Sequence, residues 1–153
     1  MKLIVGSDEK THLTESVINN LHDRGHQITL VGPLRGKEEL WPAVARQVAE
    51  AVASGQAEEG ILFCWTGTGV SLAANKVPGI RAALCADAET ARGARLWNNA
   101  NILCLSLRST SEVIANEILE SWFDTSYQPN KEDDTCLAQV KAIEAHYQGQ
   151  PNT

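Results

Sequence analysis

Five short apolar runs, separated by segments of helical periodicity, recur along the 153 residues of the chain. The runs cover residues 2–5, 27–32, 60–65, 81–86 and 101–107. None of them alternates apolar with polar side chains, which is typical of strands in a parallel sheet that is buried on both faces. A strand–helix order of this kind predicts an open α/β sheet with right-handed crossovers.

The segments between the runs have the spacing of amphipathic helices. In the first, Thr11 or Thr14 is the predicted cap, and Gly25 follows the helix end. A short helix is expected over residues 70–77, and another over residues 88–97. The residues that mark the apolar faces of the first, second and fifth helices are Leu13, Val17, Leu21, Trp41, Val44, Val48, Val52, Ile114, Ile118 and Trp122.

The composition fits one domain over residues 1–153, because 43% of the residues are apolar and can form a core. The net charge is −6 and Lys and Arg form no cluster, which excludes nucleic acid as a partner. No apolar run has the length of a signal peptide or a membrane span, so we expect a cytoplasmic protein without a membrane partner. The four cysteines have no Cys-x-x-Cys spacing and are expected to be free thiols.

Residues 124–153 differ from the rest of the chain. Residues 124–135 are polar and rich in turn formers, and helical spacing returns at Leu137, Val140 and Ile143. A terminal helix on such a polar arm packs either on a partner subunit or on its own domain. The spacing alone favours neither arrangement.

Polar residues and glycines follow the predicted strands. In open α/β sheets, ligands bind outside the carboxyl ends of the strands. This rule gathers Asp8, residues 64–69, Asp87 and Arg108 around one crevice. Asp8 also stands at a position that is common for a helix cap.

The Gly-Thr-Gly turn at residues 67–69 follows the third strand and opens a helix. Free backbone N–H groups there suit an anion or a developing oxyanion. The dinucleotide fingerprint lacks its third glycine, and the Gly-Lys-Ser/Thr ending of a P-loop is absent. Cys64 lies just before these amides, where a thiolate is favoured and can act as a base or nucleophile. Cys85 and Cys104 are expected to be packing residues, and no His/Cys spacing indicates a metal site.

The segment GILFCWTGTGVSLAANKVPGIRAALCAD, residues 60–87, resembles the core signature of the ribose-5-phosphate isomerase B family, which includes the galactose-6-phosphate isomerase subunits. VGSD near the N-terminus and NNANILCLSLR are similar as well, so the resemblance spans nearly the whole chain. It implies a Rossmann-like three-layer α/β sandwich with a five-stranded parallel sheet and a C-terminal helix that packs on a partner subunit. It also implies aldose–ketose isomerisation through an enediol(ate), no metal or other cofactor, and a homodimer or tetramer with shared active sites.

The resemblance also assigns roles to residues of this chain. Cys64 matches the base that moves a carbon-bound proton, and Thr66 and Asp8 match polar groups that handle hydroxyl protons. An enediol(ate) path needs such a base, together with donors for the growing oxyanion. The substrate-binding residues predicted from the same positions are Glu9, Trp65, Gly67, Thr68, Gly69, Ser71, Trp97, Asn98 and Arg108.

Several positions depart from the family pattern. Glu9 and Trp97 stand where the family usually has histidines, and the histidine matched by Trp97 helps to open the sugar ring. Trp65 replaces a glycine and Trp41 a tyrosine, and the basic phosphate-binding segment of the tail is reduced to Lys131 among acids. Fewer charge-assisted partners for phosphate argue against ribose 5-phosphate. We therefore expect a different sugar or sugar acid, short or unphosphorylated.

Two other functions fit the same residues. One is a non-catalytic sugar- or metabolite-binding protein that kept the fold and lost the family histidines. The other is a redox-responsive protein built on Cys64.

Overall fold

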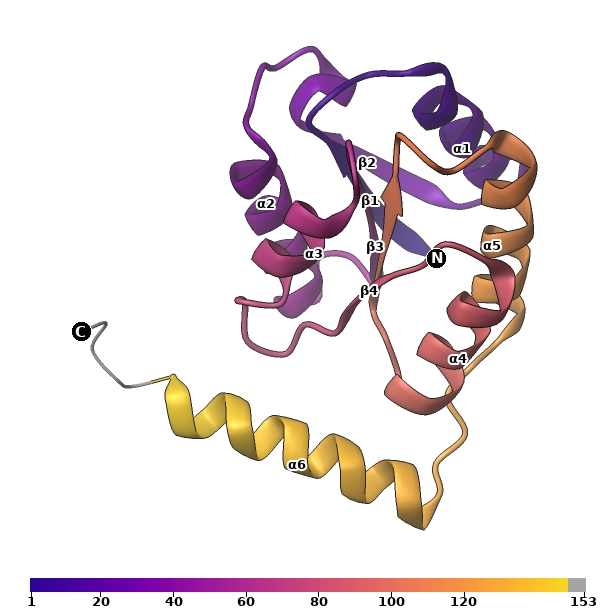
Figure 1. Cartoon of the computed structure of the whole chain (residues 1–153). Helices are drawn as coiled ribbons and strands as arrows, with labels where there is room; N and C mark the ends of the chain where they lie inside the picture. Colours follow the sequence, from indigo (N-terminus) through magenta and orange to yellow (C-terminus); the bar gives the residue numbers. More distant parts are fainter. Residues whose placement is uncertain (149–153) are drawn as a thin grey trace.

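The computed structural model, which describes residues 1–148, contains one sheet of five parallel strands in the order β2-β1-β3-β5-β4 (Figure 1). This confirms the predicted open parallel sheet. The predicted fourth strand is shorter than expected and lies at the sheet edge, where it pairs with β5 alone. The strands are β1 (Lys2–Ser7), β2 (Gln27–Val31), β3 (Glu59–Cys64), β4 (Ala82–Leu84) and β5 (Ile102–Ser106).

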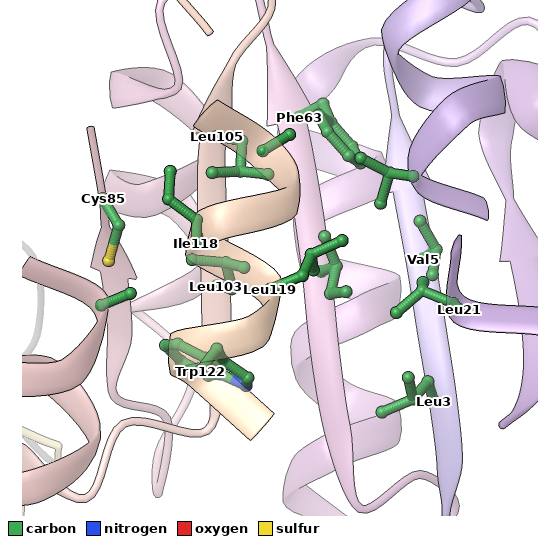
Figure 2. Close-up of a cluster of buried hydrophobic side chains, with 14 of the residues drawn as sticks. Leu3, Val5, Leu21, Phe63, Cys85, Leu103, Leu105, Ile118, Leu119 and Trp122 are labelled. Atoms are coloured by element: carbon green, nitrogen blue, oxygen red, sulfur yellow. The ribbon is translucent and has the colours of Figure 1, made fainter. Parts of the chain in front are cut away.

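Helices cover both faces of the sheet and complete a three-layer, Rossmann-like sandwich. Helices α1 (His12–Asp23), α4 (Ala88–Asn98) and α5 (Glu112–Asp124) pack on one face, and α2 (Trp41–Ala53) and α3 (Thr68–Ala74) pack on the other. Figure 2 shows Ile118, Leu119 and Trp122 of α5 packed over the central strands. Along β3, Ile61 and Phe63 face the α1/α4/α5 side, whereas Leu62 and Cys64 face the α2/α3 side.

The start of α1 settles which residue caps it. Thr11 accepts from the backbone N–H of Thr14, and the Thr14 hydroxyl accepts in turn from the Thr11 N–H, which forms a capping box. Asp8 lies three residues before this cap, so the interpretation of Asp8 as a cap is wrong. The predicted core positions Leu13, Val17 and Leu21 are all buried.

Helix α3 begins two residues before its predicted start and ends at Ala74. Gly67 has a φ of 76° and serves as the N-cap, so the helix can start at Thr68. At the other end, the Asn75 side chain donates to the Ala82 carbonyl (2.9 Å) and accepts from the Ala82 N–H (2.8 Å). Asn75 thereby holds the amino end of the edge strand β4.

The last helix, α6 (Lys131–Tyr147), lies apart from the sheet, below the end of α4 in Figure 1. It starts within the segment predicted to be polar and irregular, because Asn130 caps it and three acidic residues fill its first turn. No residue of α6 is buried, and the Glu144 carboxylate accepts from the Gly79 N–H at 2.9 Å. Within residues 1–148, no helix has the length and apolarity needed to cross a membrane.

Candidate active site

The carboxyl end of β3 is held by the end of β5. The Leu107 N–H donates to the Cys64 carbonyl (3.0 Å), and the Arg108 N–H donates to the Trp65 carbonyl (2.9 Å). The Ser106 hydroxyl also donates to the Trp65 carbonyl, at 3.0 Å. These bonds fix the backbone on both sides of the peptide that joins Cys64 to Trp65.

The two side chains at this strand end have opposite environments. Cys64 is 5% exposed and belongs to the apolar cluster on the α2/α3 face, with Val70 and Cys104. Trp65 is 57% exposed. The thiol is therefore buried at the strand end, whereas the indole that follows it projects into solvent.

Two glycines of the turn after Cys64 are closely packed, in different surroundings. A Cβ on Gly67 would lie 3.1 Å from the Leu105 carbonyl oxygen, and the positive φ adds strain for any other residue. A Cβ on Gly69 would lie 3.1–3.3 Å from ring carbons of Trp41, so the indole rests on this glycine. The hydroxyls of Thr66 and Thr68 are 2.7 Å apart, across the same turn.

Asp8 and Glu9 follow β1 at the same edge of the sheet. The buried Ser7 hydroxyl donates to the Glu9 carbonyl (2.6 Å) and accepts from the Glu9 N–H (3.2 Å), which fixes the turn. Burial raises the pKa of the half-buried Asp8 carboxyl, and the charge of Glu9 adds to the rise. A hollow of about 470 Å³ opens beside Asp8, lined also by Pro33, Glu38, Glu39 and Leu40.

Arg108 and Ser71 complete the set near β3 and differ in what they contact. Within residues 1–148, the exposed Arg108 guanidinium forms no ion pair and no hydrogen bond. Ser71 lies beside the Cys104 thiol, whose pKa is raised chiefly by complete burial. The contact of Ser71 with a substrate stays a prediction.

Trp97 and Asn98 lie near the amino ends of the strands, away from Cys64 at a carboxyl end. Helix α4 begins after the carboxyl end of β4 and runs back, so its last residues reach the amino edge, near the start of β5 (Figure 1). Both residues line a cavity of about 300 Å³ together with Ala83 of β4 and Leu137 of α6. Within one chain, the predicted site residues that follow β1, β3 and β5 therefore lie together, and Trp97 and Asn98 lie apart from them. Asp87, predicted near the crevice, caps α4 by accepting from the Thr90 N–H at 2.7 Å.

Residues 3–140 match the family model described as Ribose/Galactose Isomerase. The chain belongs to this family. It is 35% identical over 130 residues to galactose-6-phosphate isomerase subunit LacB of Clostridium acetobutylicum, covering 85% of this chain and 75% of the relative. It is 34% identical over 132 residues to ribose-5-phosphate isomerase B of Escherichia coli, covering 86% and 88%. The solved structure of Clostridium thermocellum ribose-5-phosphate isomerase B is 37% identical with a TM-score of 0.90, covering 96% of this chain and 99% of that chain.

Membership in the ribose/galactose isomerase family confirms the resemblance seen at residues 60–87 and makes the protein an isomerase of the aldose–ketose type. Such a reaction moves protons and needs no electron acceptor, so side chains and amides suffice for it. Within the described part of the chain, no three His, Cys, Asp or Glu side chains gather in a group that could hold a metal ion.

Two residues that shape this candidate site were not predicted from the sequence. Ser7 ends β1 and Ser106 ends β5, and both are buried polar residues that bond the backbone of the neighbouring turn. The signal for both was a serine at the last position of an apolar strand, where an unpaired hydroxyl would be costly to bury.

Proposed function

We propose that this protein interconverts an aldose and a ketose with Cys64 as the base that moves the carbon-bound proton. The observation that carries the proposal is the position of Cys64, at the end of β3 directly before the Gly67–Gly69 turn, in a chain of this isomerase family. The thiol is almost buried, and a base that is shielded from water is well suited to accept a proton from carbon.

In the proposed reaction, the Cys64 thiolate takes the proton from C2 of an open-chain aldose, and the C–H electron pair forms the double bond of an enediolate. Backbone N–H groups of residues 68–70 stabilise the negative charge that develops on O1. The Gly67 N–H, also expected to be free, donates instead to the Cys64 carbonyl at 3.2 Å. Thr66 and Asp8 transfer the hydroxyl proton from O2 to O1, and the raised pKa of Asp8 helps its carboxyl to hold a proton. The Cys64 thiol then returns its proton to C1, which gives the ketose.

We propose further that the working site includes a second copy of the chain, in a homodimer or a tetramer. The amino edge of one protomer would supply Trp97 and Asn98 to the crevice around Cys64 of its partner. Helix α6 supports an assembly of this kind, because it buries no residue on its own domain and leaves Val140 and Ile143 53% and 60% exposed. In the assembly, we expect α6 to pack on the partner subunit.

The substrate proposed for this site is a small sugar other than ribose 5-phosphate. Glu9 and Trp97 provide no imidazole for ring opening, so an open-chain sugar, or one opened by Glu9, fits the site. The free thiols Cys64, Cys85 and Cys104 are all buried, which agrees with a reducing, cytoplasmic location.

The decisive measurement is exchange of the C2 proton with solvent deuterium, followed by NMR over a panel of aldoses and ketoses. The Cys64→Ala variant should lose at least about 100-fold in exchange rate on the best substrate, which is the usual contribution of a general base. Cys85→Ala is the matched control, because burial raises the pKa of this thiol to about 12 and it lies on the other face of the sheet.

If Cys64→Ala kept the wild-type exchange rate, the assigned base would be wrong. A second outcome separates the binding function from catalysis. Sugars that raise the melting temperature of the protein without any exchange in the wild type would favour a non-catalytic sugar-binding protein.

A further inference from the structure

The indole of Trp41 forms one wall beside the proposed base. Trp41 begins α2, and its ring carbons Cε3, Cδ2 and Cζ3 lie 3.1, 3.2 and 3.3 Å from where a Cβ on Gly69 would stand. The ring thus packs against the backbone of the turn that follows Cys64. The side chain is still 40% exposed, so part of its surface remains open for a ligand.

Cys64 and Trp41 lie on the same face of the sheet. Cys64 belongs to the apolar cluster that α2 and α3 form with the sheet, and α2 starts at Trp41. Trp65 follows the last residue of β3 and is largely exposed. The open part of the Trp41 ring therefore lies on the same side of the sheet as the Cys64 side chain, next to the turn that follows it.

The surroundings of this wall are acidic. Asp8, Glu38 and Glu39 line the hollow beside the start of α2. The Lys37 ammonium is already paired with Glu39, and Arg35, which adds positive charge near Glu39, does not line the hollow. A phosphate dianion in this hollow would meet like charge, with no cation among the residues that line it, because Arg108, unpaired within residues 1–148, follows β5 and does not line the hollow.

An uncharged sugar meets complementary chemistry on the same surface. Carboxylates accept hydrogen bonds from hydroxyl groups, and the face of an indole packs well on the C–H face of a carbohydrate chain. We propose that Trp41 is a specificity-determining residue that selects a sugar without phosphate, by packing on its carbon chain next to the Asp8 hollow. This inference rests on the proposed isomerase function and adds the substrate class.

The test measures kcat and KM for matched pairs, an aldopentose and its 5-phosphate and an aldotetrose and its 4-phosphate. The wild type should have a kcat/KM at least about tenfold higher for the unphosphorylated member, the size of discrimination that a pocket wall provides. Trp41→Ala should raise KM for the unphosphorylated sugar about tenfold with a smaller change in kcat, and Trp41→Phe should keep most of the preference. Val113→Ala, an exposed apolar residue on α5, should leave both constants unchanged.

A second variant tests the charge argument without touching the core. Glu38 is exposed, so Glu38→Lys should fold normally and raise kcat/KM for the phosphorylated sugar about tenfold at low salt, less at high salt. A structural defect would lower kcat/KM equally for the sugar and its phosphate. A change in substrate preference would alter the ratio of the two kcat/KM values.

The outcomes separate this inference from the proposed function. A wild-type enzyme that prefers the phosphorylated sugars, or a ratio that neither variant changes, would overturn the role of Trp41 and leave the isomerase intact. If no sugar is turned over, the proposed isomerase function fails. The preference between each sugar and its phosphate is then measured by the rise in melting temperature that each one causes. Stabilisation by unphosphorylated sugars that Trp41→Ala removes would support the inference, and its absence would overturn it.

Discussion

Gly67 is the residue on which the turn after Cys64 depends most directly. Its φ of 76° lies in the left-handed region, and the space where a Cβ would stand is filled by the Leu84 side chain and the Leu105 backbone. The turn approaches β5 so closely that a methyl group must displace the Leu84 side chain and press on the Leu105 backbone. Because the same backbone leads from the proposed base to α3, a shift here changes the geometry of the whole site.

We expect Gly67→Ala to lower the free energy of unfolding by about 3 kcal/mol, from backbone strain together with the contact with Leu105. Gly25→Ala is the matched control, because Gly25 has a φ of 79° and no neighbouring atom lies within 4 Å of where its Cβ would stand. It should cost about 1 kcal/mol, from strain alone. Equal urea-unfolding curves for the two variants would contradict the steric argument.

For individual residues, the sequence predicted the position in the sheet better than the degree of burial. The strand-end rule puts Asp8, Cys64 and Arg108 at one edge of the sheet, and the structure places them there. The spacing of Trp41 with Val44 suggested a core position, but Trp41 is the first residue of α2 and lies on Gly69, partly exposed. Periodicity indicates which face a residue takes, and gives no information on whether the helix end extends beyond the sheet.

Three elements meet in a buried polar network at the amino edge of the sheet. Glu59 begins β3, Arg95 comes from α4 and Trp122 from α5. The Arg95 guanidinium lies 2.6 Å from one Glu59 oxygen, and the Trp122 indole N–H donates to the other at 2.7 Å. Arg95 also packs over the Trp122 ring, with 5.0 Å between the guanidinium carbon and the ring centroid. This network joins two helices to the central part of the sheet.

We expect Glu59→Gln to destabilise the protein by about 3 kcal/mol, because it leaves the largely buried Arg95 charge without its carboxylate. Arg95→Met in the same background should recover part of that loss, and a double-mutant cycle by urea unfolding measures the coupling. Glu50→Gln, which removes an exposed pair with Arg46, should cost less than about 1 kcal/mol. A cost for Glu59→Gln no larger than for Glu50→Gln would show that the network contributes little.

Sequence reasoning could not find this network. Glu59 precedes the apolar run, so the predicted strand began after it, and a charged residue there is expected to be solvent-exposed. Its partners lie 36 and 63 positions further along the chain, a separation that no local pattern encodes. The start of α6 was missed for a local reason, since the acidic run that indicates a polar arm also favours a helix N-terminus.

The predicted site residues of one chain lie in two groups. Asp8, Cys64 and Arg108 lie at the carboxyl ends of the strands, whereas Trp97 and Asn98 lie at the amino ends. The alternation of strands and helices predicted the number of strands and their parallel direction, because both follow from local pattern and crossover rules. The position of β5 between β3 and β4 was not predictable in this way. Neighbour choice depends on pairing over long sequence separations, and all these strands are similarly apolar.

The shared site can be tested by mixing inactive subunits. Cys64→Ala and Asn98→Ala should each be inactive as pure proteins, whereas a fully exchanged equal mixture of dimers should regain about a quarter of wild-type activity. The reason is that half of the dimers pair one variant with the other, and one of their two sites is then intact. Activity and dimer content are measured on the same sample, by proton exchange and by light scattering.

A matched mixture serves as the control. Cys64→Ala mixed with Asp8→Ala should stay inactive, because both substitutions affect the same edge of the protomer and no site is complete. A Cys64→Ala and Asn98→Ala mixture that forms mixed dimers yet stays inactive would show that each site belongs to one chain.

The central place of β5 in the sheet also affects how the chain can fold as it is synthesised. Until residues 102–106 have left the ribosome, β3 has no neighbour on one side and β4 has no neighbour at all. A nascent chain that stops before residue 102 therefore exposes an apolar strand edge that can pair with other chains. We therefore expect synthesis through β5 to remove this exposed edge.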